Sequence, residues 1–100
     1  MTGISKTQKF YPFTNDRQFL WAGLMSNVKS AFKKAKMFNY QTDKVFIFFK
    51  TKQQNFQVRS IKLNKKISSP LSIEDDLKQA FLKLYRKNVS YQSVSCHLTN

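Results

Sequence analysis

The sequence has few of the residues that interrupt or cross-link a folded chain. Its 100 residues include two glycines, two prolines and one cysteine, Cys96. A single thiol cannot form an internal disulfide. A chain with one unpaired cysteine is more typical of a reducing compartment. So few glycines and prolines exclude an internal flexible linker and a Gly-rich phosphate loop. We therefore expect residues 1–100 to form one domain around one core.

Acidic side chains are also scarce, and their positions argue against catalysis. There are five: Asp16, Asp43, Glu74, Asp75 and Asp76. Four of them are expected at helix starts, where they complement the helix dipole. Metal-dependent phosphoryl transfer needs two or three clustered carboxylates, and only Asp43 is uncommitted. The single histidine, His97, has no evident triad partner. We predict no catalytic residue, no metal site and no cofactor in this chain.

Long apolar runs are missing as well. No stretch approaches the roughly 20 apolar residues of a spanning helix. The first residues also do not have the basic start and apolar run of a signal peptide. We expect no membrane partner.

Positive charge is what the chain has in excess. Lys and Arg number 18 against 5 Asp and Glu, which gives a formal net charge of +13. Self-repulsion at this charge opposes compaction, so the excess indicates a polyanionic partner. Hydrophobic residues make up 41% and include ten Phe, which is enough to build a packed core. The chain is therefore expected to fold and to bind nucleic acid.

The first half of the sequence predicts a strand, a helix and a second strand. The first strand covers residues 4–11 and is ended by Pro12. Asn15 is predicted as the helix N-cap, with Gln18 in a capping-box position. The helix ends near residues 38–39, and residues 45–51 form a buried strand. The helix has one apolar stripe, made of Leu20, Leu24, Val28, Ala31, Phe32 and Ala35.

The second half predicts a strand, a helix and a final strand. Residues 52–55 form a turn that joins a strand over residues 56–63 into a hairpin. Ser72 is predicted to cap the second helix, with Asp75 answering it, and Asn88 ends that helix. The last strand covers residues 89–98. The second helix has its own apolar stripe, made of Ile73, Leu77, Ala80, Phe81, Leu84 and Tyr85.

The resulting order is β-α-β-β-α-β, which predicts an α+β fold. Each helix has one apolar stripe, and both stripes can pack on the same face of a four-stranded antiparallel sheet. The other face then stays open as a platform for nucleic acid. Basic and hydroxyl side chains along the strands and their turns are the candidate phosphate contacts, whereas the lysines of the first helix are interpreted as a solvated face. The candidate DNA-backbone contacts are Ser5, Lys6, Thr7, Lys9, Lys50, Lys52, Arg59, Ser60 and Lys62.

Three positions leave alternatives open. Phe46 and Phe48 alternate with apolar neighbours, so they could stack bases on the open face or form a small second apolar patch. Cys96 alternates with Val94 and Leu98 and is interpreted as a small core residue. Side chains alternate between the two faces of a strand, and Arg59 and Lys62 are an odd number of positions apart. One of them can therefore point away from the open face.

Several segments together resemble a known family. They are residues 4–7 with Phe10, residues 14–16 with 19–21, the strand 45–51, Phe56 with residues 58–63, Phe81 with Leu84 and Tyr85, Tyr91, and residues 93–99. In order and spacing they resemble the little-finger domain of Y-family translesion DNA polymerases, nearest the UmuC-type (ImpB/MucB/SamB) branch. Two positions depart from the family: Ile61 stands where a second Arg is common, and Ser93 where a Gly is usual.

The resemblance implies a function for the chain. In that family the sheet of this domain lies in the major groove of template-primer DNA and contacts mostly phosphates. Catalysis, with its Mg²⁺, belongs to a palm domain that is absent here, so the chain is expected to be excised from a longer polymerase. Accessory subunits or a sliding clamp would be partners through the parent chain. A bacterial, cytoplasmic, nucleoid-associated location and a role in the SOS response and DNA repair follow from the same resemblance.

Two other functions share the predicted topology. One is an RNA-binding module of the RRM type, but such a module needs aromatics and a Gly on its third strand, and residues 57–63 have neither. The other is a basic protein-interaction domain that uses Phe46 and Phe48. Comparing duplex DNA with single-stranded RNA separates these alternatives from a duplex-binding domain.

Overall fold

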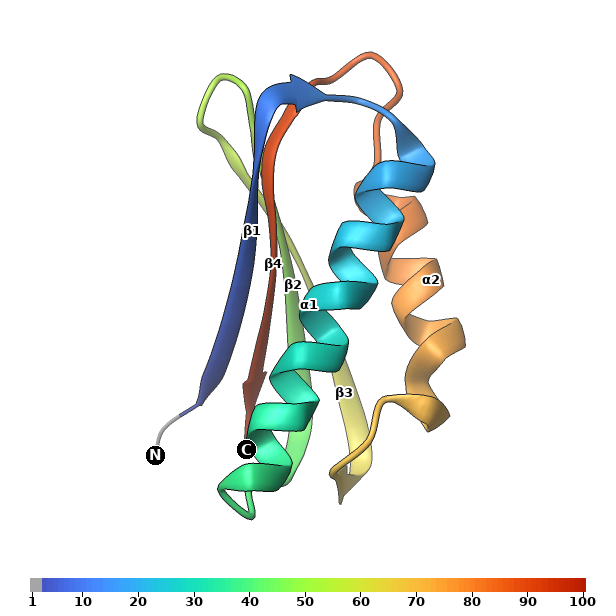
Figure 1. The fold of residues 1–100 in the computed structure, drawn as a ribbon. Helices are drawn as coiled ribbons and strands as arrows, with labels where there is room; N and C mark the ends of the chain where they lie inside the picture. The colour runs from blue at the N-terminus through green and yellow to red at the C-terminus, as the bar shows by residue number, and fades with distance from the viewer. Residues whose placement is uncertain (1–2) are drawn as a thin grey trace.

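The computed structural model describes residues 3–100, which form a four-stranded antiparallel sheet covered on one side by two helices (Figure 1). The spatial order of the strands is β1-β4-β2-β3. This confirms the predicted fold class and element order. The elements in chain order are β1 (Ile4–Thr14), α1 (Arg17–Met37), β2 (Thr42–Thr51), β3 (Phe56–Ile67), the 3₁₀ turn η1 (Leu71–Ile73), α2 (Glu74–Leu84) and β4 (Tyr91–Thr99).

The core lies between the sheet and the helices. Helix α1 packs over β1 and β4, and α2 packs over β3 and β2. On β2 the buried side chains are Val45, Ile47 and Phe49, each fully shielded from solvent. Both predicted helical stripes are buried, apart from the half-buried Tyr85. Because each helix has one apolar stripe, burying both on one side leaves the other side of the sheet uncovered.

The cap of α1 differs from the prediction by one residue. The Asp16 carboxylate, not the Asn15 side chain, accepts a hydrogen bond from the backbone N–H of Phe19 (3.2 Å). The Asn15 side-chain amide instead donates to the backbone carbonyl of Lys87 (3.1 Å). Asn15 therefore ties the start of α1 to the chain leaving α2, a role that its local sequence does not signal.

Helix α2 is shorter than predicted at both ends. Residues 71–73 form a 3₁₀ turn, and no side chain caps α2, so the predicted Ser72 cap is wrong. The helix ends at Leu84 rather than Asn88. The reason is Tyr91, whose buried hydroxyl donates to the carbonyl of Leu84 (3.2 Å) and accepts from the N–H of Arg86 (2.8 Å). This hydroxyl satisfies backbone groups that a further helical turn would otherwise need.

The strands also differ from their predicted limits. Strand β1 continues through Pro12 to Thr14, where the prediction ended it at Tyr11. Pro12 is tolerated because β1 is an edge strand and its pairing with β4 is irregular between Lys9 and Thr14. Strands β2 and β3 extend beyond the predicted 45–51 and 56–63, and β4 begins two residues later than predicted.

Substituting the cap residues tests whether Asp16 caps α1 and Ser72 does not cap α2. We expect Asp16→Ala to destabilise the domain by about 1 kcal/mol, because the N–H of Phe19 loses its partner. For a domain of this size that corresponds to a loss of about 4–8 °C in Tm by thermal circular dichroism. Ser72→Ala is the matched control and should change the free energy of unfolding by less than about 0.5 kcal/mol. A larger loss from Ser72→Ala than from Asp16→Ala would contradict the assignment of the cap.

Candidate nucleic-acid interface

Strand pairing decides which side of the sheet each side chain occupies. Directly paired residues of antiparallel strands point to the same side. Val45 pairs with Leu98 and Ile61, and these side chains face the helices. Phe46 pairs with His97 and Ser60, and these point to the opposite side.

We call that opposite side the open face. Its residues follow from the regular pairing of β1 with β4, β4 with β2, and β2 with β3. It consists of Ser5, Thr7 and Lys9 on β1, Ser93, Ser95, His97 and Thr99 on β4, Lys44, Phe46, Phe48 and Lys50 on β2, and Phe56, Val58, Ser60 and Lys62 on β3.

The structure brings together most of the predicted contacts and separates two of them. Lys52 lies in the turn between β2 and β3. Lys6 pairs with Cys96 and Arg59 pairs with Ile47, so both point to the helix side. The predicted residues on the open face are Ser5, Thr7, Lys9, Lys50, Ser60 and Lys62.

Arg59 has surroundings unlike those of Lys62. It lines a hollow of about 250 Å³ between β3 and α2 that Asp76 and Lys83 also line. The structure therefore shows which of the two residues points away from the open face. Lys62 belongs to the open face, and Arg59 lies beside the acidic start of α2.

Lys44 is an open-face residue that the sequence prediction missed. It is directly paired with Lys62 across β2 and β3. The signal was present, because Lys44 continues the two-residue period of Phe46, Phe48 and Lys50. Like charges placed directly opposite in a sheet are destabilising, so this pair concentrates positive charge at one end of the face.

Basic residues lie on both sides of the molecule, whereas the acidic group of α2 lies on the helix side alone. The regularly paired segments of the sheet, residues 4–9, 44–50, 56–62 and 93–99, contain no acidic residue. Glu74, Asp75 and Asp76 lie in the first turn of α2, on the helix side, as the sequence predicts. Asp43 lies on β2 directly before Lys44, just outside these segments. Within the segments, the open face has lysines and no carboxylate.

Aromatic rings occupy the centre of the open face. Phe46 and Phe48 lie with ring centroids 6.2 Å apart and planes inclined by 28°. His97 lies 6.2 Å from Phe46 between centroids. The structure thus decides the orientation that the sequence left open, since both phenylalanines point away from the helices. They are half-buried by their neighbours on the face.

A row of hydroxyl groups runs beside these rings. The Ser5 hydroxyl and His97 Nδ1 are hydrogen-bonded, and Thr7 Oγ1 lies 2.9 Å from Ser95 Oγ. All four side chains, with Phe48, line a hollow of about 310 Å³. Hydroxyl groups can donate to phosphate oxygens or accept from base amino groups, so this row can bind either.

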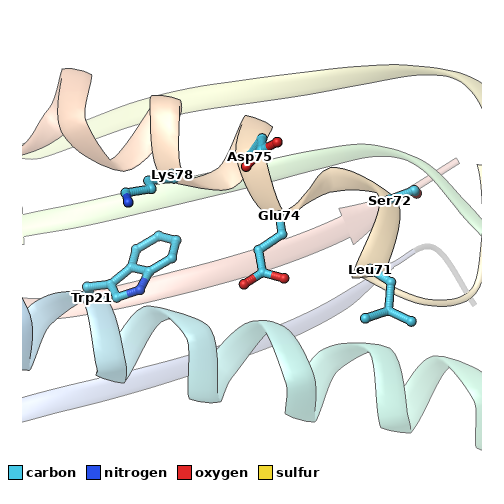
Figure 2. Close-up of a pocket in the computed structure, with 6 residues that line it drawn as sticks. All are labelled: Trp21, Leu71, Ser72, Glu74, Asp75 and Lys78. Atoms are coloured by element: carbon cyan, nitrogen blue, oxygen red, sulfur yellow. The ribbon is translucent and has the colours of Figure 1, made fainter.

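The helix side has a hollow of a different kind. Trp21 of α1 lines a hollow of about 370 Å³ together with Glu74, Asp75 and Lys78 of α2, and Figure 2 shows the Glu74 side chain directed toward α1. The indole of Trp21 packs edge-on against Phe81, with centroids 5.3 Å apart. Two carboxylates and one ammonium group line this hollow, so it lacks the local excess of positive charge found on the open face.

The described residues lack two features, a metal-binding cluster of side chains and a membrane-spanning helix. Within residues 3–100, no three His, Cys, Asp or Glu side chains gather to hold a metal ion. No helix in that range is long and apolar enough to cross a bilayer. Cys96 is fully buried, as predicted, and burial raises the pKa of its thiol from 9.0 to about 12.

The fold is shared with known DNA polymerases. The chain superposes with a TM-score of 0.76 and 14% identity on the Dbh DNA polymerase in a post-insertion binary complex, covering 98% of this chain. For DinB from Sulfolobus solfataricus the values are 0.77 and 14% over 98% of this chain. For the little finger domain of PolIV, in complex with the beta-clamp processivity factor, they are 0.76 and 6% over 97%.

The fraction of each matched protein that this chain covers shows which domain they have in common. This chain spans 28% of the Dbh and DinB polymerases but 86% of the PolIV little finger domain. No protein-family model matches the sequence, and no curated protein matches it closely enough to count as a relative. The chain therefore has the fold of the little finger domain of Y-family DNA polymerases, as the sequence resemblance predicted.

Thiol labelling tests the burial of Cys96. A thiolate is the reactive species, and a pKa of about 12 keeps the native thiol protonated at pH 8. We expect a thiol-specific reagent to leave the folded protein unlabelled and to label it fully in denaturant, measured by mass spectrometry. Because the folded pKa lies above the unfolded one, this thiol stabilises the fold below about pH 9 and loses that contribution as pH rises toward 12. Rapid labelling of the folded protein at pH 8 would contradict this burial.

Proposed function

We propose that this chain is the DNA-binding domain of a translesion DNA polymerase and that its open face grips the backbone of template-primer duplex. One observation supports the proposal above all. Lys44 and Lys62 face each other on a sheet surface whose paired segments contain no acidic residue. A bound phosphate converts this repulsion into attraction, which is a reason for the pair to exist.

The width of the sheet fits the proposed partner. Lys9 lies on the edge strand β1, and Lys62 lies on the opposite edge strand β3. Neighbouring strands are about 4.8 Å apart, so the two edges are separated by about 14 Å. The major groove of B-DNA is about 12 Å wide. The sheet is therefore about as wide as one groove. Lys9 is in register with Phe56, six positions from Lys62 on β3, so the two lysines lie diagonally across the face.

The chemistry of these contacts implies binding without sequence preference. Lysines, hydroxyls and backbone amides contact phosphates, which position a protein on DNA but do not report its sequence. With Lys9, Lys44, Lys50, Lys52 and Lys62 as the contacts, log Kd should rise with log salt with a slope of about 4–5. A polymerase that copies any template needs this kind of grip.

The rest of the proposed activity belongs to a longer chain. The matched Dbh and DinB polymerases are more than three times as long as this domain. Nucleotide transfer and its Mg²⁺ are assigned to a palm domain of the parent polymerase, acting in DNA repair in a bacterial cytoplasm. The PolIV little finger domain is described in complex with a beta clamp, and a clamp contact is the corresponding proposal here. The helix side remains free for such a contact while DNA occupies the open face.

Paired charge substitutions test the location of the grip. We expect Lys44→Gln with Lys62→Gln to weaken binding to a labelled duplex and to lower the salt slope by about two units. Lys29→Gln with Lys33→Gln on α1 removes the same net charge, so long-range attraction falls equally in both variants. The α1 variant should keep the slope. Fluorescence anisotropy titrations at several salt concentrations measure both quantities.

Two further measurements sharpen this test. Lys62→Gln should weaken binding more than Arg59→Gln, because the two side chains lie on one strand but point to opposite sides. Adding duplex DNA should not change the fluorescence of Trp21, because this single tryptophan lies on the helix side. Equal losses in the open-face and α1 variants would show that binding is diffuse and would reject the proposed grip.

The isolated domain should not extend a primer. We expect no nucleotide incorporation with Mg²⁺ or Mn²⁺, because residues 3–100 offer no carboxylate cluster for two-metal phosphoryl transfer. A gel-based primer-extension assay, with a complete polymerase as positive control, measures this. Incorporation that co-purifies with the domain through several columns would refute the assignment as a non-catalytic part.

A further inference from the structure

The open face has more apolar surface than a phosphate grip requires. Phe56 is 63% exposed and Val58 is 46% exposed, and both lie on the same face as Phe46 and Phe48. Together the four side chains form an apolar strip across β2 and β3. We propose that this strip and the neighbouring hydroxyl row hold an unpaired nucleotide, so that the open face also binds single-stranded nucleic acid. The inference deepens the proposed function, because it assigns a second form of nucleic acid to the same face.

The aromatic strip suits unpaired bases rather than a duplex. Bases inside a duplex are stacked on each other and present only their edges in the grooves. An unpaired base has free π-faces, and stacking on protein aromatics is how sequence-tolerant single-strand binding works. Phe46 and Phe48 lie two residues apart on one strand, at a shallow angle of 28°. They therefore offer two adjacent platforms for successive bases.

Cations lie where the phosphates of a stacked nucleotide would be. The Lys44 ammonium is 5.1 Å from the centroid of Phe46, and the Lys50 ammonium is 5.4 Å from that of Phe56. A base that covers a ring displaces such a cation from the ring face, and its flanking phosphate then supplies a new partner. The same side chains thus serve both the ring and the backbone of one nucleotide.

The hollow beside Phe48 supplies polar groups for a base edge or a phosphate. Its volume of about 310 Å³ is at the lower end of the range for small-ligand sites. Hydroxyls of Ser5, Thr7 and Ser95 line it together with the His97 ring. An aromatic wall with several hydroxyl groups on one side is a suitable arrangement for one nucleotide.

Charge selects nucleic acid over a protein as the occupant. The apolar strip is bordered by Lys44, Lys50 and Lys62, and the paired strand segments contain no carboxylate. A protein segment that packs on the apolar strip would also need acidic side chains opposite these three lysines. A nucleic-acid strand supplies flat rings and negative charge at the same time.

The test separates stacking from charge. A labelled oligothymidylate and a labelled blunt duplex are titrated with the wild type and with Phe46→Leu/Phe48→Leu, which keeps apolar bulk but removes the rings. We expect the oligothymidylate to bind about 5- to 50-fold more weakly, with the salt slope unchanged, because stacking releases no counterions. Duplex affinity should stay within about twofold. Phe19→Leu/Phe38→Leu, which changes two exposed rings outside the open face, should leave both affinities unchanged.

A second variant keeps the ring and reports its contact directly. In a Trp21→Phe background, Phe48→Trp places the only indole on the open face. We expect oligothymidylate to quench its fluorescence at saturation, because a stacked base contacts the indole. Absence of quenching at saturating oligothymidylate would overturn the inference even if the leucine variant fails to fold.

The outcomes also distinguish this inference from the proposed function. If the leucine variant binds oligothymidylate like the wild type while Lys44→Gln/Lys62→Gln loses duplex affinity, the nucleotide site is wrong and the duplex grip stands. If binding of the single strand depends on Phe46 and Phe48 but duplex does not bind, the duplex grip is wrong and the nucleotide site stands. If the wild type binds neither ligand, both are wrong.

Discussion

The register of β2 between β4 and β3 is the constraint on which the rest of the structure depends. Side chains alternate along a strand, so a slip of one residue would exchange Val45, Ile47 and Phe49 for Lys44, Phe46 and Phe48 beneath the helices. Burying Lys44 in the core would require an uncompensated buried charge, which costs several kcal/mol. The hydrophobic effect and the cost of burying charge therefore select one register, and that register also assembles the open face.

The same alternation gives the molecule two chemically different sides. The helix side holds the three acidic residues of α2 and the hollow at Trp21, whereas the open face combines lysines, hydroxyls and aromatic rings. Tyr91 keeps the two layers in place, because its buried hydroxyl binds backbone groups at the end of α2 while its ring packs on Phe49. Burial raises the pKa of this phenol above its ordinary value, so its protonated, donating form persists to higher pH than that of an exposed tyrosine.

Sequence reasoning was accurate where a signal is local and periodic, and wrong where several distant residues share a task. The two helical stripes and the alternation of Val94, Cys96 and Leu98 were predicted because the 3.6- and 2-residue periods are properties of the backbone. The cap of α1 was misassigned because Asn15 and Asp16 are both acceptable cap residues by composition. Choosing between them depends on Lys87, 72 residues from Asn15, whose carbonyl binds the Asn15 side chain. The Ser72 cap was wrong because residues 71–73 form a 3₁₀ turn before α2. Pro12 was taken as the end of a strand because its tolerance depends on β1 being at the edge of the sheet.

The sequence by itself determined the order of elements, the composition of the core and the excess of positive charge. These depend on neighbours within a few positions along the chain or on composition. Only the tertiary structure decided which cations act together. Strand pairing brought Lys44 opposite Lys62, moved Arg59 and Lys6 to the helix side, and joined Ser5 to His97 across 92 positions. The physical reason is that the face a side chain occupies in a sheet follows from the register with its neighbouring strands, and that register is set by the burial of the whole core.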